Sequence, residues 1–111
     1  MKIFLTGGAG YIGSVCTEYL LDRGHEVMVW DNLTEGHRSA VDARARFVEG
    51  DLADRERLMS VVKEFGAEAV LHFAANALVG ESMTNPSKYY RNNVSSAVNL
   101  ADAAVAAGVR V

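Results

Sequence analysis

Four apolar runs along the chain have the composition of buried β-strands. Each contains β-branched, aromatic or leucine residues, the first three are followed by glycine or aspartate, and the first is typical of a strand covered on both faces. The runs comprise residues 2–6, 26–30, 46–49 and 69–73. We therefore predict four short strands, with a polar loop after the second that extends to about Ala40.

Between these runs the apolar residues recur at the spacing of an α-helix. One helix is predicted from Tyr11 to Gly24 and a second from about Asp54 to Gly66. A third begins at residues 85–86, where asparagine can cap the helix and proline fits its first turn, and runs to about Ala107. The positions expected to be buried are Ile12, Val15, Cys16, Tyr19 and Leu20, then Leu58, Val61, Val62 and Phe65, then Tyr90, Val94, Ala97, Val98, Ala101 and Val105.

Strands that alternate with helices specify a parallel sheet, because parallel neighbours need crossover connections that place helices on the sheet faces. We predict an α/β fold, the N-terminal half of a Rossmann-type doubly wound parallel sheet with the strand order 3-2-1-4. Residues 109–111 look like the start of a fifth strand. No internal repeat or linker divides the chain, so residues 1–111 are expected to form a single domain.

Composition and charge narrow the possible partners. The 111 residues are 50% apolar and carry a net charge of −3, so no overall positive field draws the chain to nucleic acid or to an anionic membrane. No apolar stretch approaches the length of a membrane span. The single cysteine, Cys16, has no partner for an internal disulfide, and we expect a cytoplasmic protein.

Three glycines lie between the first predicted strand and the first predicted helix. Gly7, Gly10 and Gly13 form a GxxGxxG pattern. A diphosphate can be held by free N–H groups at a helix N-terminus only where the backbone approaches it closely, and Gly10 would permit that approach. Gly7 would form the tight turn and Gly13 would let the helix pack closely. The alternative is a glycine-rich turn without a ligand.

An acidic residue follows the second predicted strand. Asp31 lies near the offset of roughly 20 residues at which an acid bonds an adenosine ribose in dinucleotide-binding folds. A carboxylate here accepts hydrogen bonds from two ribose hydroxyls and repels a 2′-phosphate, which favours NAD over NADP. The alternative is that Asp31 only starts a turn. Together with the glycines it predicts dinucleotide binding.

Further motifs give the chain a resemblance to a known family. They are Phe47-Val48-Glu49-Gly50-Asp51, His72-Phe73-Ala74-Ala75, Val79-Gly80-Glu81-Ser82 and Pro86-Ser87-Lys88-Tyr89-Tyr90-Arg91-Asn92-Asn93-Val94. With the glycine turn and Asp31-Asn32, they resemble the N-terminal part of the extended short-chain dehydrogenase/reductases, and among these the UDP-glucose 4-epimerase family. The resemblance covers the whole chain. It departs from the family at Ala77, where many relatives carry a lysine.

The resemblance implies NAD as the cofactor and a set of contact residues for it. These would be Gly7, Gly10, Tyr11, Ile12 and Gly13 at the turn, Asp31 and Asn32 at the ribose, Asp51 and Leu52 at the adenine, and Phe73, Ala74, Ala75 and Asn92 along the cleft. Other roles remain open for three of them: Asp51 as a helix cap, Phe73 as plain core and Asn92 as a solvent-facing residue. His72 is interpreted as a hydrogen-bonded core residue without a chemical role.

In the family, NAD takes hydride from C4 of a UDP-hexose and returns it to the other face while a Tyr-x-x-x-Lys pair moves the O4 proton. No tyrosine of this chain is followed by lysine at that spacing. The resemblance therefore implies the NAD-binding part of an epimerase, with the catalytic pair and the substrate domain outside these residues. The 111-residue chain alone is expected to leave UDP-galactose unconverted.

Two other functions remain compatible with the residues. One is a sister enzyme such as a nucleotide-sugar dehydratase or reductase, and the other is a noncatalytic dinucleotide-binding module. Without a fifth strand and its helix, the fourth strand would be an uncovered edge, and apolar helix surface beside it would be bare. We therefore expect a homodimer or self-association through that edge.

Overall fold

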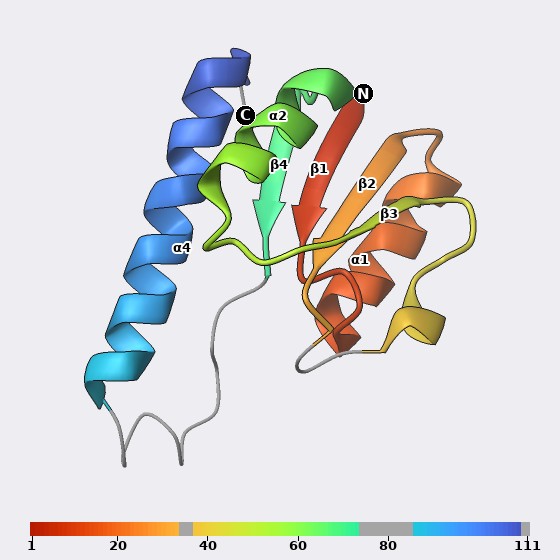
Figure 1. Ribbon diagram of the computed structural model, residues 1–111. Helices are drawn as coiled ribbons and strands as arrows, with labels where there is room; N and C mark the ends of the chain where they lie inside the picture. Colours follow the sequence, from red (N-terminus) through yellow and green to blue (C-terminus); the bar gives the residue numbers. More distant parts are fainter. Residues whose placement is uncertain (34–36, 74–85, 110–111) are drawn as a thin grey trace.

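The computed structural model describes residues 1–33, 37–73 and 86–109, with side chains given throughout except in residues 86–93. Its centre is a four-stranded parallel sheet in the order β3-β2-β1-β4. Helix α1 covers one face of this sheet, whereas α2 and α4 lie on the other (Figure 1). The α/β fold class and the strand order 3-2-1-4 predicted from the sequence are confirmed.

The helix and strand bounds lie close to those predicted. The elements are β1 (Lys2–Thr6), α1 (Tyr11–Asp22), β2 (Glu26–Asp31), η1 (Arg38–Ala40), β3 (Arg46–Glu49), α2 (Arg55–Phe65), β4 (Ala69–His72) and α4 (Pro86–Ala107). The short 3₁₀ turn η1 was not predicted. The start of a fifth strand at 109–111 is not seen at Val109, and residues 110–111 lie outside the described part.

Local sequence explains where α2 begins and ends. The Asp54 carboxylate accepts a hydrogen bond from the Arg57 backbone N–H, which satisfies one of the donors left open in the first turn. Gly66 follows the helix with φ 72°, the left-handed conformation that glycine adopts at low cost. The proposed Asn85 cap of α4 lies outside the described residues.

Each face of the sheet has its own apolar core. Trp30, Phe4 and Leu58 belong to the cluster under α2 and α4, whereas Leu5 and Val29 belong to the cluster under α1. Alternate residues of one strand thus contribute to opposite faces, as the period of a β-strand requires. Both faces of β1 and β2 are therefore covered.

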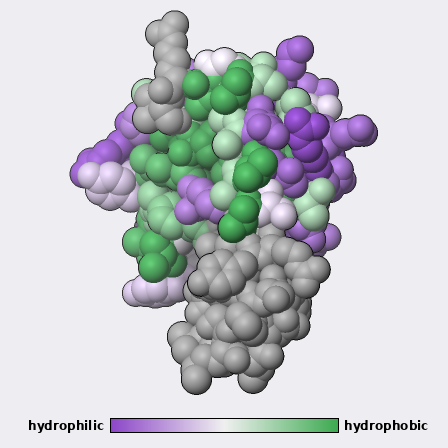
Figure 2. Space-filling view, turned by 90° about the vertical axis from the view of Figure 1, so that its left-hand side faces the viewer, coloured by the Kyte–Doolittle hydropathy of each residue, from purple (hydrophilic) through white to green (hydrophobic). Residues whose placement is uncertain are grey.

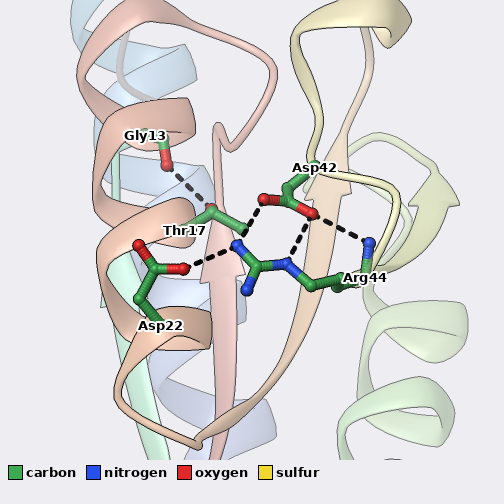
Figure 3. Close-up of polar contacts among 5 residues, drawn as sticks. All are labelled: Gly13, Thr17, Asp22, Asp42 and Arg44. Atoms are coloured by element: carbon green, nitrogen blue, oxygen red, sulfur yellow. Dashed lines mark hydrogen bonds and ion pairs between the residues drawn. The ribbon is translucent and has the colours of Figure 1, made fainter.

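An arginine on the rim ties α1 to the connection before β3. The Arg44 guanidinium contacts Asp22 at 2.9 Å and Asp42 at 2.8 Å (Figure 3). Hydrogen bonds from the side chain and the backbone N–H of Arg44 lower the pKa of Asp42 to about 2. The Arg44 and Asp22 side chains are exposed and that of Asp42 is partly exposed, so we expect this network to add little to the free energy of unfolding.

The predicted buried face is correct for α2, partly correct for α1, where Cys16 and Leu20 pack against the core, and wrong for α4. Leu58, Val62 and Phe65 are buried under α2, as predicted. In α1 and α4 several of the predicted positions are exposed instead: Ile12, Val15 and Tyr19, then Val94, Ala97, Val98, Ala101 and Val105. Helix α4 buries Leu100 and Ala103 in their place, because these residues face α2. Figure 2 looks onto the side of the molecule where α4 lies and shows hydrophobic residues gathered on that face.

In the part of the chain that the structure describes, no helix combines the length and apolarity needed to cross a bilayer.

The corrected orientation of α4 predicts the outcome of a matched pair of substitutions. Leu100→Ala is expected to lower the free energy of unfolding by about 2–3 kcal/mol, since it leaves a cavity against α2. Val98→Ala, at a side chain that is half exposed, is expected to change it by less than about 0.5 kcal/mol. Urea denaturation measures both, and the reverse order of losses would contradict this packing.

Candidate functional site

The chain turns sharply where β1 ends and α1 begins. The Gly7 N–H donates to the Trp30 carbonyl at 2.9 Å, so the turn starts while the chain is still joined to β2. Gly7 has φ 77°, and the Gly10 N–H donates back to the Gly7 carbonyl at 3.2 Å. A positive φ at Gly7 is what the predicted tight turn requires.

Two glycines of this turn are needed for close packing inside the protein. A Cβ on Gly13 would lie 2.8 Å from the Gly7 carbonyl carbon and 2.9 Å from the Gly8 Cα. A Cβ on Gly8 would lie 2.8 Å from Cγ2 of Val29 on β2. The start of α1 is therefore packed directly on the backbone of the turn, and the turn is packed on the sheet.

Gly10 differs from these two glycines because a Cβ there would have only an ordinary contact with the described part of the chain. It is the N-cap of α1, with φ −81° and ψ 173°, a conformation open to any residue. Apart from its chain neighbours, the nearest described heavy atom to a Cβ there would be the Gly7 carbonyl oxygen at 3.4 Å. No contact with a described residue explains this glycine, and a side chain would project from the helix N-terminus.

The N-terminus of α1 carries the features of an anion-binding site. No side chain caps it, and its first turn contains no acidic residue. The first N–H groups of a helix have no partner within it and lie at the positive end of the helix dipole. This end of α1 can thus offer backbone donors to a phosphate group. Inside the helix, the buried Thr17 hydroxyl donates to the Gly13 carbonyl at 2.8 Å (Figure 3).

Asp31 joins the glycine turn to the end of β2. One carboxylate oxygen accepts from the Ala9 N–H at 2.9 Å and the other from the Leu33 N–H at 2.7 Å. The side chain is 7% exposed. Asp31 thus does start a local turn, and it also fixes the distance between the turn and β2. Each carboxylate oxygen has further lone pairs for a ligand hydroxyl.

The residues after β3 form the next part of the same edge. Asp51 is exposed and accepts from the Ala53 N–H at 2.9 Å. The interpretation of Asp51 as a helix cap is wrong, because Asp54 caps α2. Leu52 is buried in the core under α4, and its carbonyl accepts from the Asn99 side chain at 2.8 Å. Asn99 was not predicted, since an amide inside a helix has no distinguishing local signal.

On the other side of β1, the end of β4 is tied to the start of the turn. The Phe73 N–H donates to the Thr6 carbonyl at 2.9 Å, and Nδ1 of His72 lies 2.6 Å from the Thr6 hydroxyl oxygen. Partial burial lowers the pKa of His72, which favours the neutral imidazole. Phe73 is 40% exposed, so its interpretation as plain core is wrong. His72 as a residue is exposed, although its contact with Thr6 is partly buried, so it is not a core side chain.

The structure brings most of the predicted residues to one edge of the sheet, where the carboxyl ends of the strands meet. Tyr11 and Ile12 are exposed there at the start of α1, and Asn32, also exposed, follows Asp31. Ala74 and Ala75 lie outside the described residues, as does the side chain of Asn92. Among the described residues no group of metal-ligating side chains comes together.

Sequence reasoning missed Thr6, which is fully buried. A polar residue at the last position of an apolar strand was the available signal. The arrangement as a whole has backbone donors and a helix dipole beside a carboxylate, and these groups suit a diphosphate next to a diol. Its position, where strand order reverses between β1 and β4, is where open α/β sheets bind ligands.

Comparison with known proteins places the whole chain in one group of relatives. The UDP-glucose 4-epimerase of Corynebacterium glutamicum is 50% identical over 109 residues, which make up 98% of this chain and 32% of that protein. The corresponding enzyme of Lactobacillus helveticus is 44% identical over 110 residues, covering 99% of this chain and 33% of that protein. The chain thus spans about a third of the length of these relatives.

Solved structures agree with the fold. A Thermus thermophilus UDP-glucose 4-epimerase in complex with NAD has a TM-score of 0.94 and 40% identity, covering 99% of this chain and 35% of that chain. A Thermotoga maritima UDP-glucose 4-epimerase with UDP-glucose has a TM-score of 0.94 and 33% identity. The match covers 98% of this chain and 35% of that chain.

The sequence profile of the NAD dependent epimerase/dehydratase family matches residues 3–111, almost the entire chain. The chain therefore belongs to the NAD dependent epimerase/dehydratase family.

Proposed function

We propose that residues 1–111 are the NAD-binding domain of a UDP-glucose/UDP-galactose 4-epimerase. The observation that carries the proposal is the uncapped N-terminus of α1, which begins on the backbone of a glycine turn beside the Asp31 carboxylate. The relatives are UDP-glucose 4-epimerases, and several of their solved structures hold NAD.

The residues present fit the cofactor. The missing side chain at Gly10 would let a diphosphate approach the first N–H groups of α1, with Tyr11 and Ile12 exposed beside it. Asp31 has spare lone pairs for the ribose hydroxyls of the adenosine half, and the edge at Asp51 and Leu52 takes the adenine. When bound, NAD supplies a reversible hydride acceptor.

The activity belongs to the intact protein. This chain's residues would bind and orient the cofactor, and the group that moves the O4 proton would come from elsewhere in the protein. The Tyr-x-x-x-Lys pair of the family does not occur in these 111 residues. The UDP-hexose would be held by a further domain, and the Thermotoga maritima relative contains UDP-glucose.

Gly10→Ala tests the approach of the diphosphate. The backbone at Gly10 accepts alanine, so the thermal midpoint should stay within a few degrees, while NAD affinity measured by NMR titration should fall by at least about tenfold. A suitable control is Gly66→Ala. Gly66 has φ 72°, so an alanine there should lower the free energy of unfolding by roughly 1 kcal/mol. Gly66 lies beyond the end of α2, so this variant should bind NAD as tightly as the unmodified chain.

An unmodified chain that does not bind NAD would contradict the proposal. Equal NAD affinity for the Gly10→Ala variant would show that the diphosphate does not lie at the start of α1.

Asp31→Asn tests the ribose contact. The unmodified chain should bind NAD more tightly than NADP, because the carboxylate repels a 2′-phosphate. Removing the charge should weaken NAD binding about tenfold, because a hydrogen bond to a charged group is lost. The ratio of NAD affinity to NADP affinity should fall as well. Asp54→Asn makes the same charge change at a helix cap where asparagine is equally good, and it should leave both affinities unchanged. An unaltered NAD to NADP ratio in the Asp31 variant would rule out this role.

We also propose that the chain self-associates. In the sheet as described, β4 is an edge strand, and α4 exposes Val94, Val98 and Val105. Unpaired strand edges and apolar patches both favour contact with another chain. Light scattering at increasing concentration should show a dimer or larger species, and a monomer at all concentrations would contradict this.

A further inference from the structure

The last residues of β1 and β4 form a polar pair on the face of the sheet that carries α2 and α4. Thr6 and His72 are register partners, and their side chains meet through Oγ1 and Nδ1 at 2.6 Å. Thr6 is fully buried, whereas His72 as a residue is exposed. Nδ1 faces the buried hydroxyl, which leaves Nε2 as the ring nitrogen that a ligand could meet.

The buried hydroxyl decides which ring nitrogen carries the proton. Among the described residues, Nδ1 of His72 is the only hydrogen-bond partner of the Thr6 side chain. If Nδ1 carried a proton, it would donate to Thr6, and the hydroxyl proton would be buried without an acceptor, at a cost of about 1–3 kcal/mol. If Thr6 donates instead, both groups are satisfied. The neutral imidazole is then the tautomer with hydrogen on Nε2.

The lowered pKa of His72 agrees with this assignment. A protonated ring would carry hydrogen on both nitrogens. Its Nδ1–H would then donate to the Thr6 hydroxyl, whose own proton would have no described acceptor. The geometry therefore keeps one N–H on the outer edge of the ring at neutral pH. In the described part of the chain Nε2 has no hydrogen-bond partner.

The position of His72 indicates which part of a ligand it would meet. A dinucleotide with its adenosine ribose at the end of β2 and its diphosphate at the start of α1 extends its other half toward β4, the strand on the opposite side of β1. His72 is the last residue of β4.

We propose that His72 is a further ligand-binding residue, and that its Nε2–H donates to an oxygen of the nicotinamide-side ribose or its phosphate. This inference rests on the proposed NAD binding. Thr6 would act as a positioning residue that fixes the tautomer.

Two substitutions separate the inner contact of the ring from the outer one. In His72→Asn the amide oxygen lies near the position of Nδ1 and can still accept from Thr6, but the outer donor is lost. In His72→Gln the amide nitrogen lies near the position of Nε2 and keeps the outer donor, while Thr6 loses its acceptor. The thermal midpoint and the NAD dissociation constant are measured for both variants and for the unmodified chain.

The asparagine variant is expected to keep its thermal midpoint and to bind NAD about five- to tenfold more weakly, the effect of one neutral hydrogen bond. The glutamine variant is expected to melt at a lower temperature and to bind NAD within about threefold of the unmodified chain. If the unmodified chain binds NAD and the asparagine variant binds it equally well, the His72 contact is overturned while the proposed function stands. If the unmodified chain does not bind NAD, the proposed function fails, and this contact fails with it.

A spectroscopic measurement tests the tautomer without any substitution. Long-range proton–nitrogen correlation NMR distinguishes protonated from unprotonated ring nitrogens in the unmodified chain. Hydrogen on Nε2, with a shift of that nitrogen when NAD is added, is expected. Hydrogen on Nδ1, or an Nε2 resonance unchanged at saturating NAD, would overturn the proposal.

Discussion

Helix α1 starts so close to the end of β1 that no side chain fits between them. A Cβ on Gly13 would overlap the Gly7 carbonyl group, and one on Gly8 would overlap Val29. This contact sets the direction of α1 and brings its first N–H groups to the edge of the sheet where the strand carboxyl ends meet. The candidate site depends on it, because the remaining groups are arranged around that helix end.

Asp31 and Thr6 connect this helix end to the strands on either side of β1. The Asp31 carboxylate accepts from the Ala9 N–H and so joins the turn to the end of β2. Thr6 joins β1 to β4 through its hydroxyl and its carbonyl. Both side chains are almost entirely buried, so their bonds to the turn and to β4 are shielded from competing water. The groups that would contact a ligand are thereby held in place by the fold before any ligand arrives.

Most of the fold follows from signals that are local in the sequence. Gly66 ends α2 through its own backbone conformation, and Asp54 caps that helix from the adjacent position. The strands are short buried runs, so their composition identifies them. The candidate site was predicted where it depends on the backbone, as at Gly7, because a tight turn limits the residue types that fit.

The rest depends on contacts between distant residues. Helix α4 has apolar residues around much of its surface, so spacing alone selected the side with Val98, while packing on α2 buries the side with Leu100. His72 looked like an interior residue because it continues an apolar strand. The structure shows it exposed, and its Thr6 partner is 66 residues away in the sequence.

The account is tested most directly by a crystal structure of this chain grown with NAD. It predicts that the diphosphate accepts hydrogen bonds from the first N–H groups of α1 above Gly10, with the adenosine ribose at Asp31. A dinucleotide bound elsewhere, or an empty helix end at saturating NAD, would contradict it.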